Sequence, residues 1–209
     1  MSANKSILIG YSGHGYVVAE AALESGINIM GYSDKDELEK NPFNIEYLGF
    51  ENSEDFIGWD LEASFIIGIG DNIIRQKIAE VVISKGKKLQ TVISKSASVS
   101  GTAKIGKGVF VNRSAAVNAL AEIGDNVILN TGCIIEHECV LGNAVHIAPG
   151  AVLAGNVKVG ERSFIGANSV VKQGVTIGRN VTIGAGSVVV RDIPDNEIWV
   201  GNPAKLHKK

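Results

Sequence analysis

The sequence lacks an excess of charge of either sign, and it lacks long apolar runs. Its 209 residues include 20 Lys and Arg against 22 Asp and Glu, which gives a formal net charge of −2 at pH 7. This balance argues against a nucleic-acid partner, because such proteins carry a basic excess. The first apolar run, residues 6–9, is too short for a signal peptide or a membrane span. We therefore expect a cytoplasmic protein with neither nucleic acid nor a membrane as its partner.

The sequence does contain a six-residue repeat. Aliphatic residues occupy every sixth position from Ile93 to Val189 without exception. This period fits neither an α-helix nor a single amphipathic strand, and it is typical of a hexapeptide β-helix of short parallel strands. Three repeats make one coil, and we expect Ile193 and Pro194 to mark the end of the coils. The flat outer faces of such a prism favour self-association, and its triangular section favours a threefold ring.

Cysteine is scarce, and both cysteines, Cys133 and Cys139, fall within this repeat. They occupy the position two residues before the aliphatic one, which elsewhere holds Ala, Val or Ser. A free cysteine packs as a small hydrophobic residue. We therefore expect both to fill the core of the prism, rather than to form a disulfide or bind a metal.

The residues before the repeat follow a different pattern. Strand-like and helix-like segments alternate there, at 6–9, 17–24, 27–32, 63–70 and 72–84. Such alternation predicts a parallel sheet with helices on its faces. The predicted fold is a small Rossmann-like α/β domain over residues 1–92, followed by a parallel β-helix over residues 93–209. The apolar side of the second helix consists of Ile73, Ile74, Ile78, Val81 and Val82.

His137 is the first candidate for catalysis. It is the second residue after Ile135, which places it at a corner of the prism, and its neighbours one coil away are the small residues Ala119 and Gly155. Histidine is the usual general base near neutral pH. Glu138 shares the corner, and a carboxylate bonded to an imidazole fixes its tautomer and makes the ring more basic. The alternative is that both side chains are simply solvated.

A metal site is not expected in the prism. Zinc bound between such prisms needs converging histidines, whereas this repeat offers only His137 and His146 on different parts of the coil. His146 directly precedes Ile147, so we expect it on an outer strand face, and His207 lies in the tail.

The glycine-rich turn at residues 10–15 follows a strand and opens a helix. This context suits phosphate binding by backbone N–H groups at a helix N-terminus. Asp34, after the second strand, is placed to bind a ribose or sugar hydroxyl. The alternative remains open that the turn uses glycine only because it is tight.

Four motifs, in order along the chain, resemble one bacterial family. They are Gly-Tyr-Ser-Gly-His-Gly at 10–15, Ile-Gly-Ile-Gly-Asp-Asn at 67–72, Ile-Glu-His-Glu-Cys at 135–139 and Val-Gly-Asn-Pro-Ala-Lys at 200–205. The chain resembles the sugar-nucleotide N-acetyltransferases of the PglD type, which are grouped with the sialic acid O-acetyltransferases of the NeuD type. The resemblance implies a left-handed β-helix and a homotrimer, with acetyl-CoA in the groove between neighbouring prisms.

The resemblance also implies roles for particular residues. His137 corresponds to the general base of the family, and Glu138 to the residue that raises its basicity. Acetyl-CoA would contact His146, Ala167 and Ala185. The nucleotide of the acceptor sugar would contact Ser12, Gly13, His14, Asp34, Lys35 and Gly70. Relatives often carry two acids where this chain has Asp34 and Lys35, which leaves the nucleotide and the sugar open.

The leading hypothesis is acetyl transfer from acetyl-CoA to the amino group of a nucleotide-linked amino sugar, for glycan or polysaccharide synthesis. His137 would take the proton while the amine attacks the thioester directly, without an acyl-enzyme. The runner-up within the same class is O-acetylation of a sugar hydroxyl, such as that of sialic acid. A third hypothesis is a non-catalytic scaffold that binds a sugar nucleotide.

Overall fold

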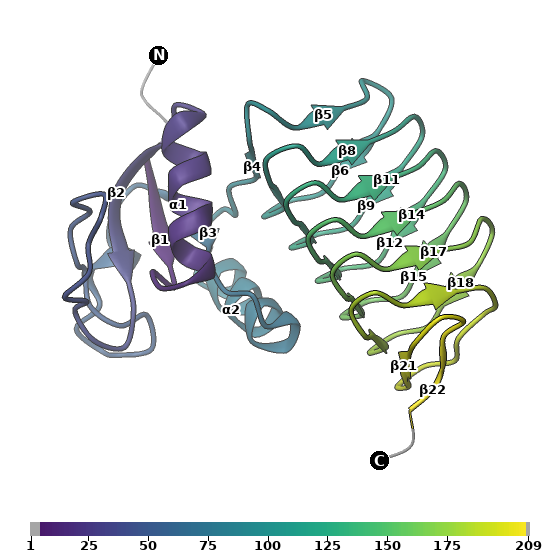
Figure 1. The fold of residues 1–209 in the computed structure, drawn as a ribbon. Coiled ribbons are helices and arrows are strands. Elements are labelled where there is room, and N and C mark those ends of the chain that lie inside the picture. The colour runs from purple at the N-terminus through teal and green to yellow at the C-terminus, as the bar shows by residue number, and fades with distance from the viewer. Residues whose placement is uncertain (1–4, 208–209) are drawn as a thin grey trace.

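The computed structural model describes residues 5–207, which form a small α/β domain beside a long parallel β-helix (Figure 1). The N-terminal sheet is parallel, with the strand order β2-β1-β3. Within the described residues, no helix combines the length and the hydropathy that a membrane span requires. The elements of this domain are β1 (Lys5–Ile9), α1 (His14–Glu24), β2 (Asn28–Ser33), the 3-10 helix η1 (Ile57–Trp59), β3 (Ser64–Ile67) and α2 (Asn72–Ser84).

The N-terminal sheet lies between the two helices because its strands alternate apolar side chains between both faces. Leu8 of β1 packs in one cluster with Val18 of α1. Its neighbours Ile7 and Ile9 pack in another cluster with Ile78 of α2. This arrangement confirms the predicted Rossmann-like α/β domain.

The apolar side of α2 is buried in the middle of the helix but not in its first turn. Ile78 and Val82 are buried, but Ile73 and Ile74 are 55% and 51% exposed. The physical reason is that α2 begins beyond the carboxyl end of β3, so its first turn has no sheet beneath it. Ile74 instead borders the pocket that is described below, and Ile73 borders a second pocket lined by Arg162, Phe164 and Thr182.

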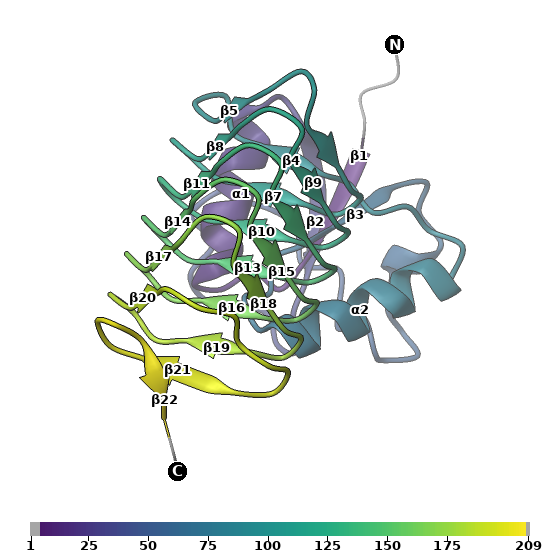
Figure 2. The ribbon, with the colours of Figure 1, turned by 90° about the vertical axis from the view of Figure 1, so that its right-hand side faces the viewer.

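The repeat forms the predicted β-helix, in which strands β4 to β20 pair in parallel with the strand eighteen residues away. Face 1 contains β4, β7, β10, β13, β16 and β19, face 2 contains β5, β8, β11, β14, β17 and β20, and face 3 contains β6, β9, β12, β15 and β18 (Figure 2). The strands are Val92–Ile93, Ser98–Val99, Lys104–Ile105, Phe110–Val111, Ala116–Val117, Glu122–Ile123, Ile128–Leu129, Ile134–Ile135, Val140–Leu141, His146–Ile147, Val152–Leu153, Lys158–Val159, Phe164–Ile165, Val170–Val171, Thr176–Ile177, Thr182–Ile183 and Val188–Val189.

The core of the prism consists of the aliphatic positions together with the small positions two residues earlier. Every aliphatic position from Val111 to Val189 is buried. The first coil differs, because Ile93 is 38% exposed and Val99 and Ile105 are only partly buried. This end of the prism has a neighbouring coil on one side only, so its side chains are less covered.

The prism continues past the end that the repeat predicts. Ile193 still pairs with Ile177, and β21 (Ile198–Val200) extends face 1 beside β19. The pairing of Thr182 with Ile198 spans sixteen residues, so this last coil is two residues shorter than the others. Strand β22 (Lys205–Leu206) then folds back antiparallel onto β21 and closes the end.

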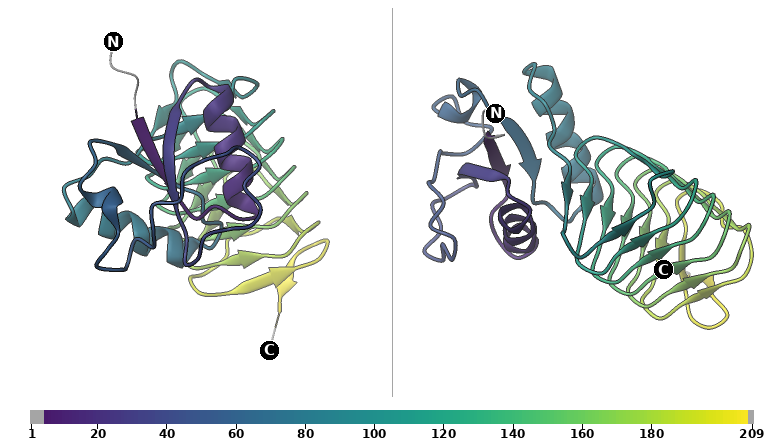
Figure 3. Two further views of the ribbon diagram at one scale, coloured as in Figure 1. Left: turned by 90° about the vertical axis from the view of Figure 1, so that its left-hand side faces the viewer. Right: turned by 90° about the horizontal axis from the view of Figure 1, so that it is seen from above.

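The α/β domain packs against face 1 of its own prism (Figure 3). The outward side chains Val92, Phe110 and Ile128 of face 1 belong to the same apolar cluster as Leu8 and Val18 of the domain. Burial of this shared apolar surface fixes the pocket of the domain relative to the coils.

Candidate active site

A pocket of about 440 Å³ lies at the carboxyl ends of β1 and β3. Ligands of open α/β sheets bind at this end of the strands. The lining contains five of the six residues predicted to contact a nucleotide, namely Ser12, His14, Asp34, Lys35 and Gly70. Gly13 is not part of the lining. It is the N-cap of α1, with a φ of 47°.

The glycine turn before α1 is as tight as its sequence suggests. A Cβ on Gly15 would lie 2.1 Å from the carbonyl oxygen of Gly10, so only glycine fits there. The N-terminus of α1 has no side-chain cap and no acidic residue in its first turn. The N–H of Gly15 donates to the carbonyl of Ser12 (2.8 Å), and no side chain caps the other N–H groups of this turn, so an anion in the pocket would be stabilised beside them.

Asp34 also supports the loop that lines the pocket. Its Oδ2 accepts the N–H of Tyr11 (3.0 Å) and its Oδ1 accepts the N–H of Lys35 (2.8 Å). The sequence analysis assigned no role at this site to several other lining residues, among them three from a segment without periodicity and one from the exposed turn of α2. These four are Phe50, Glu51, Asn52 and Ile74.

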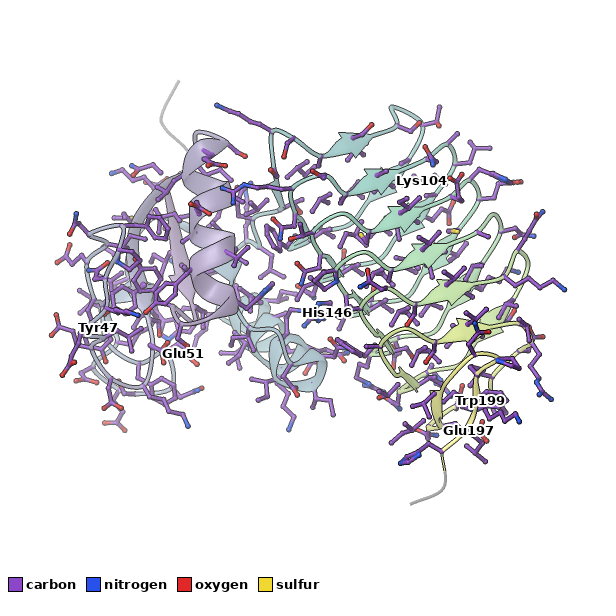
Figure 4. All side chains as sticks on the ribbon, viewed as in Figure 1. Tyr47, Glu51, Lys104, His146, Glu197 and Trp199 are labelled. Atoms are coloured by element: carbon purple, nitrogen blue, oxygen red, sulfur yellow. The ribbon has the colours of Figure 1, made fainter. Side chains whose placement is uncertain are left out.

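His146 lies between the domain and the prism (Figure 4), and its ring centroid is 6.1 Å from that of His14. Burial, together with the nearby Arg75 cation, lowers the pKa of His14 to about 4 and that of His146 to about 3. Both rings are therefore neutral at pH 7. His146 lies on an outer strand face, as expected, but the α/β domain covers it and leaves it 8% exposed.

Both ring nitrogens of His146 already have partners. Nε2 lies 3.2 Å from Nδ2 of Asn130, which can only donate, so Nε2 accepts. Nδ1 then carries the proton and lies 3.4 Å from the carbonyl oxygen of Gly70. The ring thus links the prism to the rim of the pocket.

His137 lies at the corner between β11 of face 2 and β12 of face 3, where the repeat places it. Its Nδ1 is 3.1 Å from Oε2 of Glu138, and both side chains are half exposed. The ring lies against Gly155, whose added Cβ would come within 2.4 Å of Cε1 of His137. The Nε2 atom remains available to take a proton.

One chain does not bring all the predicted residues together. Ala167 and Ala185 lie at the corner between faces 1 and 2, one coil apart. His137 lies at a different corner, and the pocket lies beside face 1. The turn after β11 is on the side of the prism away from the α/β domain (Figure 1).

The cysteines fill the core, as predicted. Cys133 and Cys139 are free and fully buried, and burial raises the pKa of Cys133 to about 12. A buried thiol of this kind is inert as a nucleophile. Among residues 5–207, no group of three or more His, Cys, Asp or Glu could hold a metal ion.

Comparisons with known families cover both parts of the chain. The family described as the PglD N-terminal domain matches residues 5–82. The bacterial transferase hexapeptide family matches residues 120–155, and the hexapeptide repeat of succinyl-transferase matches residues 156–191. A comparison with curated proteins found no significant match.

Solved structures match the whole chain. The acetyltransferase domain of PglB from Neisseria gonorrhoeae is 38% identical, with a TM-score of 0.90 over 98% of this chain and 100% of that one. The same domain has been solved in complex with acetyl coenzyme A, at 37% identity and a TM-score of 0.91, over 98% of this chain and 99% of that one.

A second solved relative was crystallised with CoA and a nucleotide-linked sugar. PerB from Caulobacter crescentus, in complex with CoA and GDP-perosamine, is 36% identical, with a TM-score of 0.90 over 98% of this chain and 97% of that one. The match in sequence and fold extends through the α/β domain and the hexapeptide coils alike. The chain therefore belongs to the PglD-type family of hexapeptide-repeat sugar acetyltransferases.

Proposed function

We propose that this protein transfers the acetyl group of acetyl-CoA to the amino group of a nucleotide-linked amino sugar, for glycan or polysaccharide synthesis. The observation that carries this proposal is the combination of a pocket in the α/β domain with the His137–Glu138 pair on the prism. The relatives solved with acetyl coenzyme A, and with CoA and GDP-perosamine, support the two substrate classes.

The acceptor binds in the pocket of the α/β domain. The N–H groups at the start of α1, which no side chain caps, bind its diphosphate next to Ser12 and Gly13. Asp34 and Lys35 lie where the ribose or base would reach, and Gly70 lies on the side that faces the prism. The nucleotide is thus held on one part of the molecule while its sugar extends from it.

The chemistry requires one base. The neutral amine attacks the carbonyl carbon of the thioester and forms the C–N bond, while Nε2 of His137 takes the proton that the nitrogen loses. The tetrahedral intermediate then breaks its C–S bond, and the departing thiolate of CoA takes the proton from His137, which restores the neutral base. Glu138 accepts the Nδ1–H of His137, which orients the ring and complements its developing charge. Buried cysteines fit this direct route, since no acyl-enzyme is needed.

The site is shared between chains of a homotrimer. The outer side of face 2 is apolar, because Ala116, Ile134, Val152, Val170 and Val188 all point outward. Val170 is 42% exposed, whereas the outer side of face 3 carries charged residues such as Lys104 and Glu122. Packing of face 2 on a second chain would bring His137 to the pocket and the acetyl-CoA groove of that chain, beside His146, Ala167 and Ala185.

Free thiols fit a reducing compartment, and we place the reaction in the cytoplasm. The alternative, O-acetylation of a sugar hydroxyl such as that of sialic acid, uses the same base. The nucleotide-sized pocket favours a nucleotide-linked acceptor over a free sugar.

The test is thiol release from acetyl-CoA by the purified protein, with UDP-, GDP- and dTDP-linked amino sugars and free sialic acid as acceptors. We expect turnover with a nucleotide amino sugar and a loss of about 10²- to 10⁴-fold in His137→Ala, the usual contribution of a positioned base. Glu138→Gln should lose activity, and Glu136→Gln, which changes the neighbouring acid, should not. Wild-type turnover in His137→Ala would overturn the assignment of the base, and turnover only with sialic acid would favour O-acetylation.

A further inference from the structure

Arg75 is a fully buried cation between the α/β domain and the prism. It lies in the first turn of α2, and only 1% of it is exposed. Burying a charge is costly unless every donor is satisfied. Burial lowers the pKa of Arg75 to about 10, so the guanidinium remains protonated at neutral pH.

The guanidinium of Arg75 bonds to both parts of the molecule at once. On the prism, Nε donates to the carbonyl of Asn126 (2.8 Å) and Nη2 to the carbonyls of Ala144 (2.8 Å) and Val145 (3.4 Å). In the α/β domain, Nη1 donates to the carbonyls of Gly70 (2.8 Å) and Ile69 (3.3 Å).

Among residues 5–207, no carboxylate accepts from this arginine. Its sixth acceptor is Oδ1 of Asn72 (2.8 Å), whose Nδ2 in turn donates to the carbonyls of Arg162 (3.0 Å) and Ser163 (3.2 Å). The nearby Asp71 caps α2, because its Oδ1 accepts the N–H groups of Ile73 and Ile74. Arg75 is therefore a connector of backbone segments rather than half of an ion pair, a role that uses the rigid, multidirectional fork of a guanidinium.

Gly70 is the point where this connection reaches the pocket. Its carbonyl oxygen accepts from Arg75 and lies 3.4 Å from Nδ1 of His146 on the prism. Gly70 also lines the nucleotide-sized pocket. A rotation of the α/β domain about this contact would move the pocket relative to the coils.

We propose that Arg75 is a positioning residue for acetyl transfer, because it fixes the pocket for the acceptor relative to its own prism, and thereby relative to the acetyl-CoA groove and to the His137 that a neighbouring chain supplies. This inference rests on the proposed function. The pocket itself is built within the α/β domain, so nucleotide binding does not depend on Arg75. What depends on Arg75 is the placement of the amino group against the thioester. A displacement of about 1 Å at that point costs on the order of 10²-fold in rate.

The test compares Arg75→Gln and Arg75→Lys with the wild-type trimer. We expect kcat to fall at least tenfold in both variants, while KM for acetyl-CoA and the Kd of UDP, GDP or dTDP, whichever the wild type binds, change less than threefold. Circular dichroism and size-exclusion chromatography define the folded fraction to which kcat refers. If Arg75→Gln does not fold, the test rests on the kcat of Arg75→Lys, which keeps the positive charge but loses the forked guanidinium group.

Arg113→Gln is the matched control. Arg113 also joins the prism to the α/β domain, through Glu20 (2.8 Å) and Glu24 (2.8 Å) of α1, but this ion pair is partly exposed. We expect its kcat to stay within twofold of the wild type. Addition of millimolar guanidinium to Arg75→Ala should restore part of the lost kcat, which a purely structural role would not predict.

The outcomes separate this inference from the proposed function. An active wild type together with an Arg75→Lys variant of unchanged kcat would overturn the positioning role alone. Equal losses in kcat and in nucleotide binding would also overturn it, because they would indicate a damaged pocket. A wild type without activity on any acceptor would overturn the proposed function, and the role of Arg75 with it.

Discussion

At the scale of single residues, the contact between Gly155 and His137 is the most informative. Gly155 lies one coil above His137 at the same corner, and its Cα occupies the space beside the imidazole. The side chain at this position therefore decides where the base points.

Gly155→Ala should lower kcat at least tenfold with little change in stability. The added Cβ would lie 2.4 Å from Cε1 of His137. The half-exposed ring would therefore have to rotate away from the position in which it serves as the base. Steady-state kinetics and thermal unfolding measure the two effects. The control is Gly101→Ala, at the same corner three coils from Gly155, where an added Cβ meets open space. Equal activity in Gly155→Ala and Gly101→Ala would contradict this account.

The buried histidines make a second prediction, on pH. His14 and His146 are neutral in the folded protein down to pH values of about 4 and 3, whereas in the unfolded chain they protonate near 6.5. The unfolded state therefore binds more protons below pH 6.5, and stability falls as pH decreases through this window. Near pH 5 the pair contributes a slope of about 2.7 kcal/mol per pH unit.

Urea unfolding of a His14→Gln variant between pH 4 and 7 measures this contribution. The slope of unfolding free energy against pH should decrease by about 1.4 kcal/mol per pH unit near pH 5. Ser12→Ala, which alters the same pocket without removing a titrating group, should keep the wild-type slope. An unchanged slope in His14→Gln would show that His14 is not held neutral.

At the scale of the elements, each coil is stabilised by the side chains that its strands direct inward. In β12, Leu141 is 2% exposed in the core while its neighbour Val140 points outward and is 38% exposed. Two adjacent residues of one strand thus belong to different environments.

Leu141→Ala should destabilise the folded protein by about 2–5 kcal/mol, because it leaves a cavity between coils that cannot collapse. Val140→Ala, one residue away, should change stability by only about 0.5 kcal/mol. Chemical denaturation at one protein concentration compares the two. Similar losses at both positions would contradict the inward and outward assignment of the strand.

At this scale the sequence predicted most of the fold. The bounds of α2 and the register of the coils follow from local pattern, because each six-residue unit repeats the same inward and outward positions. The exposure of Ile73 and Ile74 does not follow, since their apolar character fits a buried helix face equally well. The last coil could not be predicted from the six-residue period, because it is two residues shorter than the others and the repeat is broken there.

At the scale of the whole molecule, the proposed site depends on more than one chain. The pocket lies beside face 1, and His137 lies at the corner between faces 2 and 3. If neighbouring chains supply these two parts, defects in them should complement each other.

Mixed trimers of His137→Ala and Gly15→Leu test this prediction. Each variant alone should be inactive. His137→Ala lacks the base, and in Gly15→Leu the new side chain blocks the glycine turn and with it the pocket. Refolding an equal mixture should restore about a quarter of the wild-type activity, because one site in four then combines an intact pocket with an intact base. Mixing without refolding is the control. No recovery would indicate that both parts come from the same chain.

The sequence by itself determined the coils, the buried cysteines and the His137–Glu138 corner. All of these follow from a repeat that defines whether each residue points into the core, points outward or lies at a corner. The pairing of His14 with His146, the connection made by Arg75 and the enclosure of Gly70 were decided only by the tertiary structure. These contacts join segments far apart along the chain, where no local period operates. They form because burying the outer side of face 1 against the α/β domain removes apolar surface from water, and that packing brings the polar groups together.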